Sequence, residues 1–495
     1  MSNLSELLPS GGGQNAVDFV ASGTLSSGQT VILRSDGKVE AVGETPLPAI
    51  AIPQGSAAAF NVGATRFMAI GYNPSVAGQF VVVYRDNANS NSLTANLGTV
   101  SGTNITFGAD VVILANDCVY TDVSFDPNTA NKFAVVCSNQ SNSNAGTVFI
   151  GTVSGSTLSF GSAQIFNSGS VSIVYGIAYD PNVANKFVVA YYDGANSNYG
   201  TAIVGTVSGT SVSYGSPQVF SSSYSSAWQS PSFDPNTSSK FVIAFRDAAT
   251  SPAYGGAAIV GTISGTSLSF GTKATFIANG TTNNIVCSYD LKTANKFVVL
   301  YKDAGTGYGT AIVGTVSGTS ITYGSAVSIN AESSFVELNF DPNVANQFVV
   351  AYGTSAKIGT VSGTNVSFSS AYTFDSNAVS TARGDIAIAF DDAAEDGRFV
   401  IGYGASAGAS SILCDLTGTL PSTNVADFIG ITASAIADTA TGSVNTFGGI
   451  NKAQSSLTIA ADYYVQNDGT LSTTASSVKV GQAISATTIN LMDLT

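Results

Sequence analysis

The sequence predicts an all-β fold: a seven-bladed β-propeller of four-stranded antiparallel blades, inserted into a small β-rich domain that both chain termini form. Three observations predict it. A phrase of the type FDPNTANKFAVV (125–136) recurs along the chain, and a second phrase of the type GTVSGTNITFG (98–108) recurs at a similar spacing. No segment shows a helical period, so the repeated unit is built from strands.

The phenylalanine that opens the second apolar run of each repeat measures the period. It recurs, at steps of 51–56 residues, as Phe80, Phe133, Phe187, Phe241, Phe297, Phe348 and Phe399. A fixed period of this length is typical of propellers and solenoids. A β-solenoid is the alternative, but its coils are usually shorter and do not need two hairpins in each repeat.

One repeat contains four predicted strands. Residues 172–180 alternate between apolar and polar, and residues 186–193 are apolar on both faces, as a strand buried between two sheets would be. Residues 200–209 and 211–220 are joined by a tight Ser-Gly-Thr turn of the hairpin type. Radial packing of such four-stranded sheets gives a propeller, which we place at residues 46–416.

The ends of the repeat array predict how the ring closes. The seventh copy stops after its third strand, near Leu416, whereas LPAIAIPQGSAAAF (47–60) precedes the first copy and resembles a fourth strand. We expect this segment to complete the last blade, so that no open sheet edge is left between the two ends of the array.

The repeated D-P-N-x-x-N phrase predicts a turn between the first and second strands. Proline presets φ for a turn, and the Asp and Asn side chains bond the local backbone. The alternative is a calcium site, since Asp126, Asn128 and Asn131 all carry oxygen donors. A calcium loop needs more carboxylates and a glycine bend, and one copy carries Leu291 and Lys292 in place of Pro-Asn. We expect neither a metal site nor a cofactor.

Composition excludes several classes of function. The net charge is −14 with only 17 Lys and Arg, so nucleic acid is not an expected partner. The chain has no His, which excludes Ser–His and Cys–His nucleophiles and His-ligated zinc. Its start has no basic, apolar leader of the secretory type, and no apolar run is long enough to insert into a membrane. Aromatic and β-branched residues are plentiful, so we expect a folded chain.

The four cysteines are Cys118, Cys137, Cys287 and Cys414, and none forms a C-x-x-C pair. If Phe125 faces Phe133 across the hairpin, Cys118 lies level with Gln140. Cys137 is an odd number of residues from that position and points to the other face. The pattern therefore predicts free thiols, unless a bulge shifts the register.

Residues 1–45 and 417–495 flank the propeller and contain short predicted strands with Asp-Gly turns at Asp36-Gly37 and Asp468-Gly469. Each piece alone has few strands and little core. Ring closure brings the two chain ends of a propeller together. We therefore expect the two pieces to pack as one β domain.

These flanks carry a resemblance. MSNLSELLPSGGGQN (1–15) and FVASGTLSSGQTVILRSDGKVEAV (19–42) resemble the opening of structural proteins of tailed phages, especially phages of marine cyanobacteria. FGGINKAQSSLTIAADYYVQNDGTLSTTASSVKVGQAISATTINL (447–491) is similar to a module near the ends of phage tail-fibre and appendage proteins. The resemblance implies a virion protein, assembled in the host cytoplasm, that contacts other proteins of the tail, neck or capsid. Because virion sites are symmetric, we expect a homo-oligomer.

The loops that leave the second strands, together with the crossings between blades, vary in sequence and carry the candidate ligand-binding residues. Aromatic rings beside Ser and Asn are typical of adaptable recognition surfaces and would suit a host-surface glycan. The alternative is that these rings only pack at the rim. The candidates are Tyr199, Tyr224, Trp228, Tyr254, Tyr308 and Arg383.

An aspartate follows several of the second strands at the same end, often after Arg or Lys. These residues are Asp86, Asp193, Asp247 and Asp303. We expect an ion-pair or turn-capping belt there, with a polar binding ring as the alternative.

The sequence does not predict an enzyme. Glycoside hydrolysis typically uses two carboxylates about 5–10 Å apart. The predicted innermost strands carry only Asp122 and Glu337 upstream of the turn aspartate, in blades three or more apart. We expect a structural appendage that displays a surface for host adhesion. A polysaccharide depolymerase and an architectural capsid decoration without a ligand are the alternatives.

Overall fold

The structure is a computed structural model. It describes residues 15–34, 37–42, 56–169, 171–223, 227–248, 254–278, 280–332, 336–376, 378–379, 385–394, 397–405, 408–416, 428–466, 469–476 and 478–492. These ranges contain a 3₁₀ turn (Gln140–Asn142) and no α-helix, and every strand pairing named below is antiparallel. No helix in the described part of the chain has the length and apolarity needed to cross a membrane.

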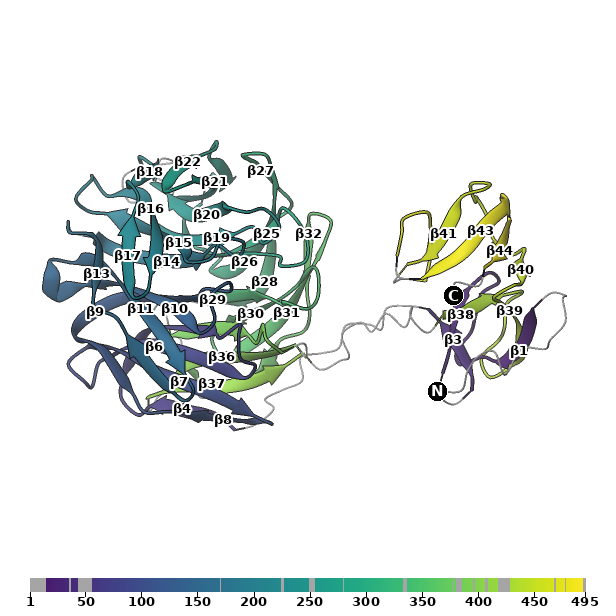
Figure 1. The fold of residues 1–495 in the computed structure, drawn as a ribbon, viewed down its shortest axis with the longest axis horizontal. Coiled ribbons are helices and arrows are strands. Elements are labelled where there is room, and N and C mark those ends of the chain that lie inside the picture. The colour runs from purple at the N-terminus through teal and green to yellow at the C-terminus, as the bar shows by residue number, and fades with distance from the viewer. Residues whose placement is uncertain are drawn as a thin grey trace. The chain divides into compact units, whose positions relative to one another are not determined.

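The chain divides into two compact units, residues 49–417 and residues 1–48 with 418–495. Figure 1 colours them along the chain. The domain boundaries expected near residues 45 and 416 fall in or beside 43–55 and 417–427, which lie outside the described residues.

The larger unit consists of repeated antiparallel sheets, as the sequence predicts. In the second to sixth repeats the first three strands pair in chain order, and two short strands together cover the outer edge of the third. The first two repeats share one sheet of β5 (Thr65–Tyr72), β6 (Gln79–Asp86), β7 (Ser92–Ser101), β8 (Asn104–Phe107), β9 (Val111–Phe125), β10 (Lys132–Asn139), β11 (Ala145–Ser154), β12 (Thr157–Phe160) and β13 (Gln164–Asn167).

The later repeats form one sheet each. The next two are β14 (Val171–Tyr179), β15 (Lys186–Asp193), β16 (Tyr199–Ser208), β17 (Ser211–Tyr214) and β18 (Gln218–Ser221), then β19 (Ala227–Phe233), β20 (Lys240–Asp247), β21 (Gly255–Ser264), β22 (Ser267–Phe270) and β23 (Ala274–Ile277). Two more are β24 (Thr282–Tyr289), β25 (Lys296–Asp303), β26 (Tyr308–Ser317), β27 (Ser320–Tyr323) and β28 (Val327–Glu332), then β29 (Val336–Phe340), β30 (Gln347–Tyr352), β31 (Ser355–Ser362), β32 (Asn365–Phe368) and β33 (Tyr372–Thr373). The last repeat contributes β34 (Ala378–Val379), β35 (Ile386–Phe390), β36 (Arg398–Ala405) and β37 (Gly408–Asp415).

The predicted fourth strand is interrupted by a bulge. In the repeat that begins with β14, Tyr214 lies opposite Gly205, while Gln218 lies opposite Ala202. Four residues therefore separate the two positions on the outer strand but only three on β16. The Gly-Ser-Pro segment at 215–217 accommodates the extra residue, and this splits the predicted strand 211–220 into β17 and β18.

The innermost strands contact one another in a cycle. β5 contacts β9, and contacts continue through β14, β19, β24, β29 and β35, which contacts β5 again. The end of the array is closed by β4 (Ala58–Asn61), which pairs with β37 so that Ser410 lies opposite Ala59. Figure 1 shows purple β4 beside light-green β37. Of the segment expected to complete the last sheet, residues 47–55 lie outside the described residues, and the rest pairs as predicted.

The core lies between successive sheets, which explains why the second strands are apolar on both faces. In β15, Phe187, Val188, Val189, Ala190 and Tyr191 are all fully buried. Alternate residues of this strand belong to the clusters before and after the sheet. The Phe187 ring lies over Gly205 of β16, which leaves no room for a Cβ at that glycine. The same arrangement pairs the repeated phenylalanine with the first glycine of the G-T-V-S-G phrase in six repeats.

The smaller unit joins the two ends of the chain. One sheet has the order β1 (Ala16–Val20), β39 (Thr441–Thr446), β38 (Phe428–Thr432), β2 (Thr30–Leu33) and β3 (Val39–Ala41). A second has the order β40 (Ile450–Asn451), β44 (Thr488–Leu491), β43 (Lys479–Ser485), β41 (Asp462–Val465) and β42 (Leu471–Ser472). Ile32, Phe428, Ile431, Tyr463 and Val480 belong to one buried cluster, so strands from both ends share one core.

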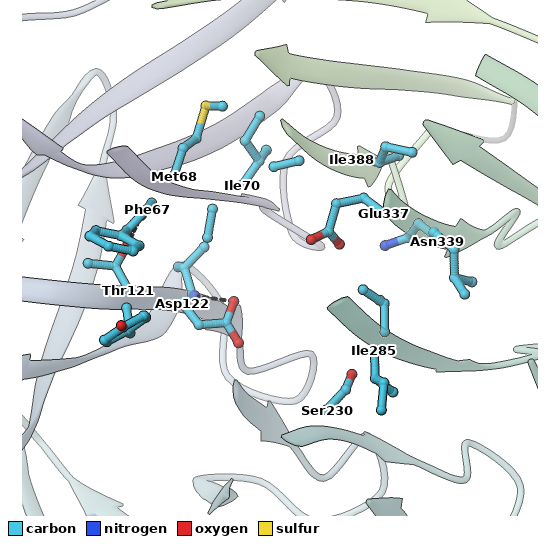
Figure 2. Close-up of a pocket in the computed structure, with 16 residues that line it drawn as sticks. Phe67, Met68, Ile70, Thr121, Asp122, Ser230, Ile285, Glu337, Asn339 and Ile388 are labelled. Atoms are coloured by element: carbon cyan, nitrogen blue, oxygen red, sulfur yellow. Dashed lines mark hydrogen bonds between the residues drawn. The ribbon is translucent and has the colours of Figure 1, made fainter. Parts of the chain in front are cut away.

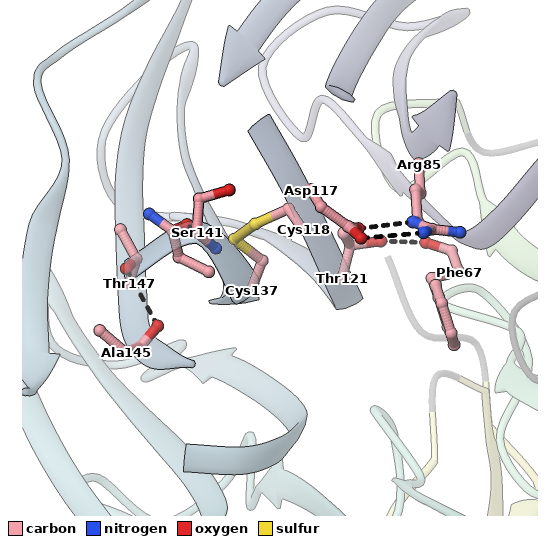
Figure 3. Close-up of a disulfide and its surroundings, with 10 residues drawn as sticks. Phe67, Arg85, Asp117, Cys118, Thr121, Cys137, Ser141, Ala145 and Thr147 are labelled. Atoms are coloured by element: carbon pink, nitrogen blue, oxygen red, sulfur yellow. Dashed lines mark hydrogen bonds and ion pairs between the residues drawn. A yellow bond between two sulfur atoms is a disulfide. The ribbon is translucent and has the colours of Figure 1, made fainter. Parts of the chain in front are cut away.

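The prediction that all four cysteines are free was wrong. Cys118 and Cys137 form a disulfide with 6.1 Å between their Cα atoms (Figure 3). Cys287 and Cys414 are buried and form no disulfide. The register between β9 and β10 shifts between Val136 and Ser138, which places Cys118 opposite Asn139. A bulge was the one exception that the pattern allowed, and it turns the two sulfur atoms toward each other.

Removing this disulfide is expected to lower the free energy of unfolding by about 3 kcal/mol, because the bond closes a loop with a sequence separation of 19 residues. Denaturant unfolding of the Cys118→Ala/Cys137→Ala variant measures the loss. The Arg85–Asp117 ion pair beside the disulfide is intact in that variant, so it does not contribute to the difference. Equal denaturation midpoints for the variant and the oxidised wild type would contradict the expectation.

Candidate functional site at the variable end and in the channel

Hydrogen bonds place the two kinds of short turn at one end of the larger unit. Gln79, Lys132 and Lys186, which begin second strands, donate from their side chains to the carbonyl oxygens of Gly155, Gly209 and Gly265 in Ser-Gly turns of the following repeats. We call this the turn end. The loops from the second to the third strand lie at the opposite end of the same strands, which we call the variable end.

The D-P-N-x-x-N turns also join neighbouring repeats. Asp126 Oδ1 accepts a hydrogen bond from the backbone N–H of Asn128, and its Oδ2 accepts one from Asn185 N–H in the next repeat at 2.7 Å. Asn185 has φ +62°, a left-handed conformation that Asn adopts more readily than most residues. The same link between repeats connects Asp180 to Ser239, Asp290 to Asn346, and Asp391 to Gly78.

The interpretation of this phrase as a turn is therefore confirmed. The sequence did not predict that the turn also connects neighbouring repeats. Both oxygens of Asp126 accept backbone hydrogen bonds, and Asn131 Oδ1 accepts one from the Asn73 amide. These oxygens are thus used within the protein. In the described part of the chain, no three His, Cys, Asp or Glu side chains gather into a group that could hold a metal ion.

The predicted ligand-binding residues are distributed over successive repeats at the variable end. Tyr199 begins β16 and is half-buried, Tyr308 begins β26 and is 37% exposed, and Tyr254 is 44% exposed. Trp228 is half-buried and packs against the core cluster between its repeat and the next. Tyr224 and Arg383 lie outside the described residues.

Tyr254 has the most developed surroundings of these residues. The Arg246 guanidinium lies over its ring, 5.0 Å from the centroid, and Arg246 Nη1 donates to Asn283 Oδ1 of the next repeat at 3.1 Å. The Tyr254 carbonyl accepts hydrogen bonds from the backbone and hydroxyl of Thr282. An exposed ring, a cation and an amide thus meet at one junction between repeats.

The aspartates after the second strands cap turns or pair with a cation, as predicted. Asp86 Oδ1 accepts from Ala88 N–H, Asp193 Oδ1 from Ala195 N–H, and Asp303 Oδ1 from Gly305 N–H. In the fourth case Asp247 forms an ion pair with Lys273. These bonds hold the loops of the variable end in place.

The innermost strands enclose a cavity of about 220 Å³ at the variable end (Figure 2). Asp122 of β9 and Glu337 of β29 both line it, and Figure 2 shows the two carboxylates directed into it from different sides. Asp122 Oδ1 accepts from Val123 N–H, and its Oδ2 accepts from Ile177 N–H of the next repeat, both at 2.9 Å. Ser230 Oγ accepts a hydrogen bond from Cys287 N–H of the next repeat in the same manner. Asp122 and Ser230 therefore both connect neighbouring repeats.

A second cavity of about 300 Å³ opens at the turn end and shares Ile70, Val123 and Asn339 with the first. We call the two together the channel. Asp392 lines the turn end. Asp392 is exposed at this opening. Partial desolvation by the channel walls, together with the nearby carboxylates of Asp391 and Asp341, raises the pKa of Asp392 above its ordinary value.

Sequence reasoning missed the aromatic residues of the channel, Phe67 and Tyr120. The sequence contained a signal for these bulges. In three innermost strands an aromatic residue lies five positions before the aromatic residue that ends the strand, namely Phe67, Tyr120 and Trp228. In a regular strand an odd spacing places two residues on opposite faces. A recurring odd spacing therefore indicates a bulge.

No protein-family model and no curated protein sequence matches the chain. Among solved structures, a lectin from Burkholderia pseudomallei aligns with 73% of this chain and 98% of its own, with 13% identity and a TM-score of 0.53. The WD40 domain of a Toxoplasma gondii coronin aligns with 83% of this chain and 89% of its own, with 10% identity and a TM-score of 0.48. These likenesses concern the fold. The likeness to the lectin, together with the repeated four-stranded sheets, assigns the larger unit to the β-propeller fold.

Proposed function

We propose that this chain is a non-enzymatic virion appendage protein of a tailed phage, whose seven-bladed propeller binds host-surface glycans through the variable end. The seven sequence repeats and the cycle of innermost strands support the blade number. The lectin among the similar structures is consistent with a propeller that binds sugars. The observation that carries the proposal is the junction of Tyr254, Arg246 and Asn283 at that end.

The physical argument concerns the two kinds of surface that a sugar presents. An exposed tyrosine ring gives the apolar C–H face of a pyranose a surface to pack on, while neighbouring polar groups bond its hydroxyls. The guanidinium over the Tyr254 ring and its hydrogen bond to Asn283 fix the orientation of these groups before a ligand arrives. Preorganisation of this kind lowers the entropic cost of binding.

Attachment to the particle is assigned to the smaller unit. The support is the resemblance of residues 1–15, 19–42 and 447–491 to phage structural modules, together with the shared sheet of β1, β2, β3, β38 and β39. We propose that copies of this unit contact one another and other proteins of the tail, neck or capsid. Cryo-electron microscopy of the intact particle tests this by showing where the density of the chain lies.

Glycan-array binding by the full-length protein tests the propeller's role. The Tyr254→Ala variant is expected to lose at least tenfold in affinity for the bound glycan, because it removes the stacking surface and leaves Arg246 without its aromatic partner. Leu291→Ala is the matched control, since Leu291 is 37% exposed at the opposite end of the strands. A propeller that binds no glycan, or that binds equally well with and without Tyr254, would contradict the proposal.

Catalysis is not part of the proposal. Asp122 accepts two backbone hydrogen bonds, one of them from the next repeat, so its carboxylate has a structural role in connecting repeats. We expect the protein to release no reducing ends from host envelope polysaccharide. Release that disappears in the Glu337→Gln variant would instead support a depolymerase.

A further inference from the structure

The innermost strands contain repeated backbone irregularities at equivalent positions near the variable end. In β5, β9, β19 and β24 the pairing with the second strand shifts register at the same place. Each shift includes one residue with a positive φ: Phe67 (+51°), Tyr120 (+56°), Trp228 (+58°) and Asn284 (+50°). Aromatic residues rarely adopt this conformation. Such strain, maintained in several repeats, is typical of positions that serve a function.

Two of these bulges form an aromatic wall in the channel. The rings of Phe67 and Tyr120 lie 4.8 Å apart, centroid to centroid, and both line the cavity at the variable end. The hydroxyl of Thr121, next to Tyr120, donates to the carbonyl oxygen of Phe67 and joins the two bulges. Figure 2 shows Phe67 at the edge of the cavity close to Thr121. The wall is therefore fixed from both strands.

The charged side chains among the residues that line the cavity are both acidic, and they lie among polar and apolar neighbours. Glu337 and Asn339 enter from β29, and Asp122 enters from β9 (Figure 2). None of the residues that line the cavity is Lys or Arg. Carboxylates accept hydrogen bonds, whereas the Asn amide both donates and accepts. A cleft lined by one sign of charge between low-dielectric walls concentrates its field and repels ligands of the same sign.

We propose that this cavity is a second sugar-binding site, which takes a single uncharged or amino-substituted sugar ring and excludes anionic sugars. The apolar face of the ring packs against Phe67 and Tyr120, and its hydroxyl or amino groups donate to Glu337. Asn339 provides both a donor and an acceptor. A cavity of about 220 Å³ suits one ring rather than an extended chain. This site is separate from the Tyr254 junction and does not depend on it.

The test uses saturation-transfer NMR on the full-length protein with galactose, glucosamine and glucuronic acid as probes. Galactose and glucosamine are expected to show saturation transfer, and glucuronic acid is expected to show none. Glu337→Ala is expected to weaken galactose binding at least tenfold, while Tyr254→Ala changes it less than twofold. Glu337→Gln keeps the volume and a hydrogen-bonding group but removes the charge, so it is expected to fold normally and to admit glucuronic acid.

The proposals for the channel site and for the Tyr254 junction can be overturned independently of each other. If galactose binding is lost in Tyr254→Ala and retained in Glu337→Ala, the sugar binds at the rim and the channel site is overturned. If none of the three sugars binds while the protein still binds a glycan array, the channel inference fails and the rim proposal stands. Equal binding of galactose and glucuronic acid by the wild type would overturn the charge-exclusion argument, and with it the assigned ligand class.

Discussion

Replacing Gly205 with valine is expected to lower the free energy of unfolding by about 4 kcal/mol, at the upper end of what single substitutions cost. Gly205 lies opposite Phe187 on one side and Tyr214 on the other, and the Phe187 ring occupies the space that a Cβ would need. Phe187 is fully buried, so its ring has no free volume to move into. Denaturant unfolding followed by tryptophan fluorescence measures the loss.

The matched control is Ser213→Val. Ser213 lies on the neighbouring strand opposite Thr206, and its side chain is exposed, so the same β-branched residue meets no ring there. The free energy of unfolding of this variant is expected to lie within about 0.5 kcal/mol of that of the wild type. If both valine variants were equally stable, the close contact between Phe187 and Gly205 would not be what restricts this position to glycine.

Phe60→Ala is expected to lower the free energy of unfolding by about 3–5 kcal/mol and to destabilise the pairing that closes the ring. Phe60 is 5% exposed in β4, and its ring lies 5.2 Å from Tyr84 and 5.6 Å from Phe107. Those two residues belong to the first repeat, whereas β4 pairs with β37 of the last. Hydrogen exchange is expected to show faster exchange of the amides in β4, β37 and β5.

Phe220→Ala provides the comparison, because Phe220 has matching surroundings in the middle of the array. It is 7% exposed, and its ring lies 5.1 Å from Phe245 and 5.8 Å from Phe270. This variant is expected to lose a similar amount of stability while β4 and β37 keep their protection. Equal exchange of β4 in both variants would show that Phe60 contributes ordinary packing and no special closure.

The repeated architecture could be predicted because it depends on local chemistry. The Asp-Pro-Asn turn, the apolar second strand and the Ser-Gly-Thr hairpin each determine their own conformation within a few residues. The pairing of 58–61 with the last repeat followed from counting strands, which needs no coordinates. The link from Asp126 to Asn185 was not predictable in the same way, because it joins residues that only the packing of two sheets brings together.

The errors arose at irregularities that a regular strand geometry ignores. The register shift between Val136 and Ser138 moved Cys118 one position along its partner strand and brought it to Cys137. The related bulges at Phe67 and Tyr120 turned aromatic residues toward the channel, where the sequence pointed only to two carboxylates. Among the predicted rim residues, Tyr254 acquired a defined environment only through Arg246 and Asn283, and Asn283 belongs to a different repeat.

The four aspartate links between repeats all run in the same direction around the ring. In four repeats the turn aspartate accepts a backbone hydrogen bond from the next repeat. Asp391 of the last repeat binds Gly78 N–H of the first in this way, although 313 positions of sequence separate them. The link that closes the ring is therefore of the same kind as the links between repeats that are consecutive in the sequence. Duplication of a whole unit of this kind adds one acceptor and one donor together. The array can therefore lengthen by entire blades without leaving either group unsatisfied. A gain of half a unit would leave one of the two groups without a hydrogen-bond partner.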